Sequence, residues 1–206
     1  MDFHVRQYYN FTNYMVYIFS KAKGGVFKMK KMQTLFEQDE KYKVLPKLRL
    51  DIKNYTMSVK KDGTSCMIKD NQLYKRYDAN QIKGRQLPKE FIACQDKPNY
   101  NGSFPVWIKV DETDYYHHEA FNIKDNWEDG TYELCGPKVN GNRERLSEHL
   151  LLKHGDDSIN GISLDYDDIK NYLEKNNVEG IVIKDEDTGI MYKIRKIDFG
   201  MKWNGK

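Results

Sequence analysis

Cysteine and net charge are both scarce in this chain of 206 residues. The three cysteines, Cys66, Cys94 and Cys135, lie far apart, and no pair has the spacing of a metal site or a redox centre. We therefore expect buried thiols in a reducing compartment. The net charge is only +3, from 34 basic and 31 acidic residues. Composition gives little evidence for a nucleic-acid partner, although a local basic patch can lie within a nearly neutral total.

Long apolar runs are also missing. The longest run near the start, residues 14–19, is too short for a membrane span or for the core of a signal peptide, and no basic flank or cleavage site accompanies it. We expect a protein without membrane association that works in the cytoplasm, or in the host cytoplasm if it is viral. The aromatic content of 13% favours an ordered chain, and its length allows a real core.

Residues 1–28 differ in composition from the rest of the chain. They are rich in Tyr, Phe and Asn and end near a Gly24-Gly25 pair, which is typical of a joint. We interpret them as an N-terminal appendage that is disordered or lies upstream of the natural start. Residues 29–206 are then expected to form one domain.

The remaining chain has the pattern of short strands separated by turns. Alternating side chains predict strands over residues 55–60 and 64–69, and Asp70-Asn71 predicts a hairpin turn before a further strand. One helix is predicted over residues 165–176, where apolar residues recur at helical spacing behind an acidic first turn. The pattern favours an α+β fold with mostly antiparallel strands.

A lysine stands at the end of the first predicted strand, in the run Lys60-Lys61-Asp62-Gly63-Thr64. A lysine at a strand end, before a turn that contains glycine, can direct its amine into a cleft. The amine is a nucleophile only when it is neutral, and neighbouring cations favour that form. Taken alone, the run is more simply an exposed charged turn, because a K-x-D-G match arises often by chance.

Four later segments change this interpretation. With the lysine segment of residues 60–63, they are residues 73–78, 130–134, 179–184 and 192–196. In this order they resemble the motifs of the covalent nucleotidyltransferases, the superfamily of DNA ligases, RNA ligases and mRNA capping enzymes. The resemblance implies the adenylation domain of a ligase, built of mostly antiparallel sheets flanked by helices.

The resemblance also implies roles for individual side chains. Lys60 would attack ATP and carry AMP as a lysyl phosphoramide, beside Asp62 and Gly63 in the nucleotide site. Glu179 would bind the metal ion, Mg²⁺ or Mn²⁺. The other implied nucleotide contacts are Arg76 and Glu133 on the ribose, Lys193 with Arg195 or Lys196 on the α-phosphate, and Lys184. The fifth motif is usually K-x-K, so the choice between Arg195 and Lys196 stays open.

A closer resemblance lies within the superfamily. Residues 34–37, 132–142 and 153–155 are similar to phrases of a small ATP-dependent RNA ligase family found in bacteria, viruses and animals, and the similarity covers about residues 32–200. It implies a monomer that joins 5′-phosphate and 3′-hydroxyl RNA ends through lysyl-AMP and RNA-adenylate intermediates. Only ten residues follow Lys196. We expect this to leave no room for the C-terminal OB domain that DNA ligases and capping enzymes generally need.

Two alternatives to an RNA ligase remain open. One is a DNA ligase or a capping-type nucleotidyltransferase, and the other is a catalytically inactive relative that binds nucleotide or RNA. The five histidines lack the ligand spacing of a zinc site. His154 is placed at the nucleotide pocket by resemblance only, and Trp107 is more simply a core or surface aromatic than a stacking platform for a base.

Strand alternation predicts where the charged residues of the last two motifs lie. If Lys184 pairs with Ile190 across a five-residue loop, Glu179 lies opposite Arg195. The carboxylate and the cations of residues 190–196 would then line one cleft. A slip of one residue would place them on opposite faces of the sheet.

Overall fold

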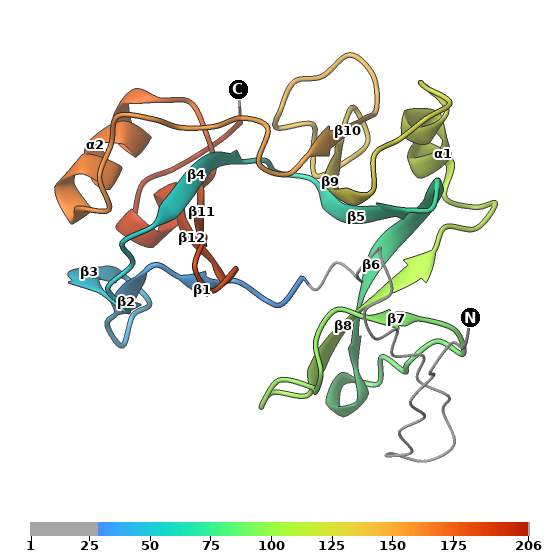
Figure 1. The fold of residues 1–206 in the computed structure, drawn as a ribbon, viewed down its shortest axis with the longest axis horizontal. Helices are drawn as coiled ribbons and strands as arrows, with labels where there is room; N and C mark the ends of the chain where they lie inside the picture. The colour runs from blue at the N-terminus through green and yellow to red at the C-terminus, as the bar shows by residue number, and fades with distance from the viewer. Residues whose placement is uncertain (1–28, 206) are drawn as a thin grey trace. The chain divides into compact units, whose positions relative to one another are not determined.

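The computed structural model describes residues 29–205, and the predicted appendage of residues 1–28 lies outside them (Figure 1). The described chain is an α+β structure of short, mostly antiparallel strands with two α-helices, which confirms the predicted class. The chain divides into two compact units. The first contains residues 64–132, and the second contains residues 32–63 and the chain from Glu133 onward. Within the described range, no helix is long and apolar enough to cross a membrane.

The first unit is built on four neighbouring strands in the order β5-β6-β8-β7. Its elements are β5 (Thr64–Lys69), β6 (Gln72–Asn80), η1 (Gln81–Lys83), β7 (Ile92–Ala93), β8 (Ser103–Lys109) and α1 (Tyr115–Phe121). Asp70 and Asn71 join β5 to β6 with φ of 52° and 54°, the left-handed pair that a two-residue hairpin turn requires. The predicted turn is confirmed, and Trp107 is a fully buried core residue.

The second unit is built on a four-stranded sheet in the order β1-β12-β11-β4. Its strands are β1 (Gln33–Thr34), β4 (Tyr55–Lys60), β11 (Gly180–Asp185) and β12 (Met191–Arg195). The β1–β12 pair is parallel, and the other two pairs are antiparallel. The remaining elements are β2 (Phe36–Gln38), β3 (Val44–Leu48), β10 (Leu150–Lys153), α2 (Tyr166–Lys175) and η2 (Lys196–Phe199), and strand β9 (Gly130–Cys135) enters this unit at Glu133.

Helix α2 confirms the helix predicted over residues 165–176. Asp165 is its N-cap, and the Asp165 carboxylate accepts a hydrogen bond from the backbone N–H of Asp167. Ile169 and Leu173 are fully buried in the core that α2 shares with one face of the sheet. Burial of each such side chain contributes about 1.5–3 kcal/mol. The amphipathic pattern in the sequence therefore identifies the face of α2 that packs on the sheet.

The pairing of β11 with β12 differs from the predicted register. We expected Lys184 to lie opposite Ile190, but Lys184 lies opposite Met191. The turn between the strands accordingly begins later, and the backbone N–H of Asp185 donates to the carbonyl oxygen of Ile190 at 2.9 Å. The predicted register is therefore wrong by one residue.

The hydrophobic core explains the observed register. Ile181, Ile183 and Ile194 are fully buried on one face of the hairpin. Lys193 lies opposite Val182, on the other face. The predicted register would have placed Lys193 beside Ile181 on the core face, where a charged group is costly to bury. Burial of the isoleucines therefore decides which face carries the cations.

Candidate active site

Lys60 is the last residue of β4, and Gly180 lies opposite it on β11. Gly180 in turn lies opposite Arg195, so Lys60 and Arg195 lie in one row of the sheet with a glycine between them. A Cβ atom at Gly180 would lie 2.3 Å from the carbonyl oxygen of Ile194, so only glycine fits there. Gly180 takes the place opposite Arg195 that the predicted register gave to Glu179.

Lys193 lies two residues before Arg195 on β12, so both project from the face that carries Lys60. Lys196 lies outside this row, because it begins η2 after the strand has ended. Its backbone N–H donates to the carbonyl oxygen of Glu179 at 3.0 Å. Among the cations of the fifth motif, the structure brings Lys193 and Arg195 to the Lys60 face, while the Lys196 backbone holds the segment that carries Glu179.

The amine of Lys60 is in contact with the Glu179 carboxylate, with 2.5 Å between Nζ and Oε2. Glu179 precedes β11, so strand alternation does not fix the direction of its side chain, and the wrong register did not separate the two residues. The Lys60 and Glu179 side chains are only 19% and 17% exposed. Burial raises the pKa of the Glu179 carboxyl, and the nearby charge of Lys60 opposes this rise only in part.

Two cations on the same face have different surroundings. Lys193 is half-buried, and its burial, reinforced by the positive charges of Arg195 and Lys60, lowers its pKa. Arg195 is held by Asp198, which is 3% exposed and accepts hydrogen bonds from Arg195 Nη2 at 2.9 Å and from Nε at 3.2 Å. Asp198 therefore fixes the plane of the Arg195 guanidinium on this face.

Glu133 lies on β9 and is buried, with an exposed fraction of 8%. Its Oε1 accepts from the backbone N–H of Gly63 at 3.1 Å, and its Oε2 lies 2.9 Å from His154 Nε2. The resemblance predicts a ribose contact for Glu133. In the structure its carboxylate contacts both the turn that follows Lys60 and the ring of His154, and the ribose contact stays a prediction.

Two further residues predicted for the site have partners of their own. Lys184 is exposed near the far end of β11, where its amine forms an ion pair with Glu186 at 2.6 Å. It is four residues, or about 13 Å of extended strand, from Gly180. Arg76 belongs to the first unit, on β6, where its Nε lies 3.3 Å from Asp78. Within the second unit, the group around Lys60 therefore does not include Lys184, and the predicted ribose contact of Arg76 stays a prediction.

Three residues near Lys60 were not predicted as site residues: Asn140, Arg143 and Glu144. Each forms a hydrogen bond with Asp62 in the turn that follows Lys60. Asn140 lies in the segment 132–142 that resembles the RNA ligase family, but that resemblance gave it no role. The turn-forming composition of residues 140–142 is a second signal, and Asn140 does adopt a left-handed conformation with φ of 44°. That signal predicts a turn and says nothing about what the turn contacts.

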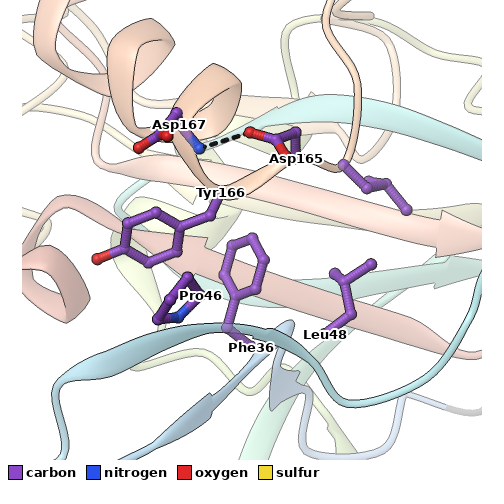
Figure 2. Close-up of a pocket in the computed structure, with 7 residues that line it drawn as sticks. Phe36, Pro46, Leu48, Asp165, Tyr166 and Asp167 are labelled. Atoms are coloured by element: carbon purple, nitrogen blue, oxygen red, sulfur yellow. Dashed lines mark hydrogen bonds between the residues drawn. The ribbon is translucent and has the colours of Figure 1, made fainter.

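A pocket of about 500 Å³ lies elsewhere in the second unit, beside the start of α2 (Figure 2). Its lining residues are Phe36, Pro46, Leu48, Leu164, Asp165, Tyr166 and Asp167. Figure 2 shows that the Asp165 carboxylate turns toward the backbone of Asp167, as the helix cap requires. The Phe36 and Tyr166 rings pack edge to face with centroids 5.4 Å apart. None of the predicted site residues lines this pocket, so we assign it no role in catalysis.

A divalent cation is the cofactor that the family resemblance implies, with Glu179 as its ligand. Carboxylate oxygens are the ligands that Mg²⁺ and Mn²⁺ prefer. Asp62 lies close enough for its negative charge to raise the pKa of Glu179, so a cation there would relieve the repulsion between two carboxylates. Among residues 29–205, no group of three or more His, Cys, Asp or Glu side chains could hold a metal. The donor chemistry fits a hard cation whose other ligands are phosphate oxygens and water.

No protein-family model matches the chain, and no curated protein matches it in sequence. The family resemblance of the motifs therefore stays a prediction.

Proposed function

We propose that this protein is an ATP-dependent RNA ligase that joins 5′-phosphate and 3′-hydroxyl RNA ends. One observation carries the proposal: the largely buried amine of Lys60 contacts Glu179 and shares its sheet face with Lys193 and Arg195. An exposed charged turn would not need a lysine with 19% exposure beside a buried carboxylate and two further cations. The proposal includes a monomer that acts in the cytoplasm, or in that of a host.

The first step would form lysyl-AMP. The neutral Lys60 amine attacks the α-phosphorus of ATP, a P–N bond forms, and the bond to the pyrophosphate oxygen breaks. The nitrogen then loses its proton to solvent. Lys193 and Arg195 would stabilise the negative charge that develops on the α-phosphate oxygens. A divalent cation held by Glu179 would supply further neutralisation of phosphate charge.

Two further transfers would complete sealing. An oxygen of the RNA 5′-phosphate attacks the phosphorus of lysyl-AMP, which releases Lys60 and leaves an RNA-adenylate. The 3′-hydroxyl of the other end then attacks the 5′-phosphate, AMP leaves, and a phosphodiester bond remains. The cations of the Lys60 face would stabilise phosphate charge in each of the three transfers.

Labelling with nucleotide tests the first step. The protein is incubated with Mg²⁺ or Mn²⁺ and with ATP or GTP that is labelled at the α-phosphate, and acid-labile covalent label is measured. We expect label from ATP in the wild type and in Lys61→Ala, whose side chain pairs with Asp157, and none in Lys60→Ala. Label from GTP alone would indicate a capping enzyme. No label under any condition would refute the enzyme proposal.

The polymer is tested separately. Nicked or single-stranded RNA and DNA with 5′-phosphate ends are supplied to the ATP-charged protein, and joined products are separated by size. We expect joining of RNA ends. Joining of DNA ends alone would indicate a DNA ligase, and tight binding without any joining would indicate an inactive relative.

A further inference from the structure

One peptide unit connects Lys60 to a residue that no motif predicts. The unit joins Lys61 to Asp62, and its carbonyl oxygen accepts a hydrogen bond from Lys60 Nζ at 3.1 Å. Its N–H donates to Glu144 Oε1 at 3.2 Å. A peptide unit is planar and rigid. Any rotation that takes the N–H away from Glu144 therefore also takes the carbonyl away from the Lys60 amine.

Gly63, the next residue of the turn, is hydrogen-bonded through both its N–H and its carbonyl oxygen. The N–H of Gly63 donates to Glu133 Oε1 at 3.1 Å, and its carbonyl oxygen accepts from Asn140 Nδ2 at 2.7 Å. A Cβ atom at Gly63 would lie 2.2 Å from the carbonyl oxygen of Leu134, so the turn lies directly against β9. Three consecutive peptide units after Lys60 are thus each hydrogen-bonded to a side chain of the segment 133–144.

The Asp62 side chain is bound by the same segment. Its Oδ1 accepts from Asn140 Nδ2 at 3.0 Å, and its Oδ2 accepts from Arg143 Nη1 at 3.1 Å. Asn140 therefore uses both hydrogens of one amide nitrogen, one on the Asp62 carboxylate and one on the carbonyl of Gly63. Arg143 is 51% exposed, so its ion pair adds little stability, and its effect is to orient Asp62.

The segment that makes these contacts has internal order of its own. The Asn142 side-chain amide donates to the carbonyl oxygen of Leu146 at 2.9 Å, and Asn142 Oδ1 accepts from the N–H of Leu146 at 2.9 Å. This pair of bonds encloses Arg143 and Glu144. Val139, the residue before Asn140, is buried with an exposed fraction of 8%. A braced loop can hold a neighbouring turn, whereas an unordered loop cannot.

We infer that Asn140, Arg143 and Glu144 form a clamp that positions the Lys60 amine. The clamp fixes the turn of residues 61–63, and the Lys61 carbonyl in turn fixes Lys60 Nζ. The three residues touch neither ATP nor RNA in this account, so they are positioning residues. The catalytic consequence rests on the proposed function, because a nucleophile that is misplaced by about 1 Å can lose roughly 100-fold in rate.

The decisive variant is Asn140→Ala, because Asn140 bonds both Asp62 and Gly63. The measurement is the single-turnover rate of lysyl-AMP formation, compared with the rate of sealing of RNA that is already adenylated. Sealing of pre-adenylated RNA does not require attack by Lys60. We expect the variant to lower the first rate by about 10- to 100-fold and the second by less than about threefold. An equal loss in both reactions would overturn the clamp, since general damage to the fold affects both.

Two comparisons keep the test specific. Asn160→Ala removes an exposed asparagine from the same unit, and we expect it to leave both rates unchanged. Arg143→Lys keeps the charge beside Asp62, so it should retain most of the lysyl-AMP rate that Arg143→Ala loses. If Arg143→Lys and Arg143→Ala lower the rate of lysyl-AMP formation equally at an unchanged melting temperature, Arg143 does not orient Asp62 through its charge and hydrogen bond.

Amide hydrogen exchange tests the clamp without any nucleotide. The N–H of Asp62 donates to Glu144, and the N–H of Gly63 donates to Glu133. Neither N–H group is hydrogen-bonded to Asn140. We expect Asn140→Ala to speed exchange at both N–H groups by about tenfold or more, because the whole turn loses its order. Unchanged exchange would overturn the inference. If the wild type forms no lysyl-AMP, the proposed function fails, and the exchange result still decides whether the clamp exists.

Discussion

Lys60 Nζ and Glu179 Oε2 lie 2.5 Å apart, which makes the proposed nucleophile and the proposed metal ligand a single ion pair. Both side chains are more than four-fifths buried. A variant that changes one partner therefore changes the electrostatic surroundings of the other.

Glu179→Gln is expected to lower the rate of lysyl-AMP formation by about 100-fold. The substitution keeps the size of the side chain and removes the charge that would hold a divalent cation. The measurement is single-turnover labelling with ATP over a range of Mg²⁺ concentrations. Glu174→Gln, on the exposed side of α2, is the matched control. Equal rates in the wild type and Glu179→Gln at every Mg²⁺ concentration would rule out this role.

The same variant is expected to become relatively more stable as the pH rises. Burial raises the pKa of Glu179 above its ordinary value of 4.5. Between pH 4.5 and its folded pKa this carboxyl binds more protons in the folded state than in the unfolded state, so the stability that it contributes falls as the pH rises through that window. The glutamine side chain of the variant does not titrate. Urea unfolding at pH 4.5 and pH 8 should show the difference in unfolding free energy shifting in favour of the variant, and a constant difference would contradict the raised pKa.

Asp198→Asn is expected to lower the free energy of unfolding and to weaken the binding of ATP phosphate. Asp198 is buried and accepts two hydrogen bonds from the Arg195 guanidinium. Loss of its charge should cost about 1–3 kcal/mol of unfolding free energy and leave the guanidinium less ordered. We expect a raised KM for ATP in lysyl-AMP formation. Asp156→Asn, on an exposed loop, should change neither quantity.

Gly180→Ala is expected to destabilise the second unit and to abolish lysyl-AMP formation. The new Cβ atom would lie 2.3 Å from the Ile194 carbonyl oxygen, so β11 and β12 would have to separate. The cost should be about 3 kcal/mol, the upper end for an overpacked site. Gly189→Ala is the comparison, because Gly189 has open space and only its φ of 70° opposes a side chain, at about 1 kcal/mol. An equal cost for both variants would contradict the steric explanation.

Local signals in the sequence predicted local structure well. The Asp70-Asn71 pair predicted a two-residue turn, and both residues have positive φ. The spacing of apolar residues predicted a helix over residues 165–176, where the structure has α2. In each case the cause and the result lie within a few residues of one another, so a single sequence contains the information.

The register of β11 and β12 was missed for a physical reason. The prediction counted loop residues between Lys184 and Ile190, whereas the fold chose the pairing that buries Ile181, Ile183 and Ile194 together. The clamp was missed because its partners are remote. Asn140 follows Asp62 by 78 residues, and no periodic pattern connects the two.

In the turn between β11 and β12, an insertion or deletion would be more damaging to the fold than a substitution. The turn closes with the Gly189 N–H on the Asp185 carbonyl oxygen at 2.7 Å. One residue added or removed between these positions would exchange the inner and outer faces of β12, which would bring Lys193 into the core and turn Ile194 toward solvent. The number of residues in this turn is therefore under a tighter constraint than the identity of its exposed residues. Related sequences should differ by substitutions in the turn while keeping its length.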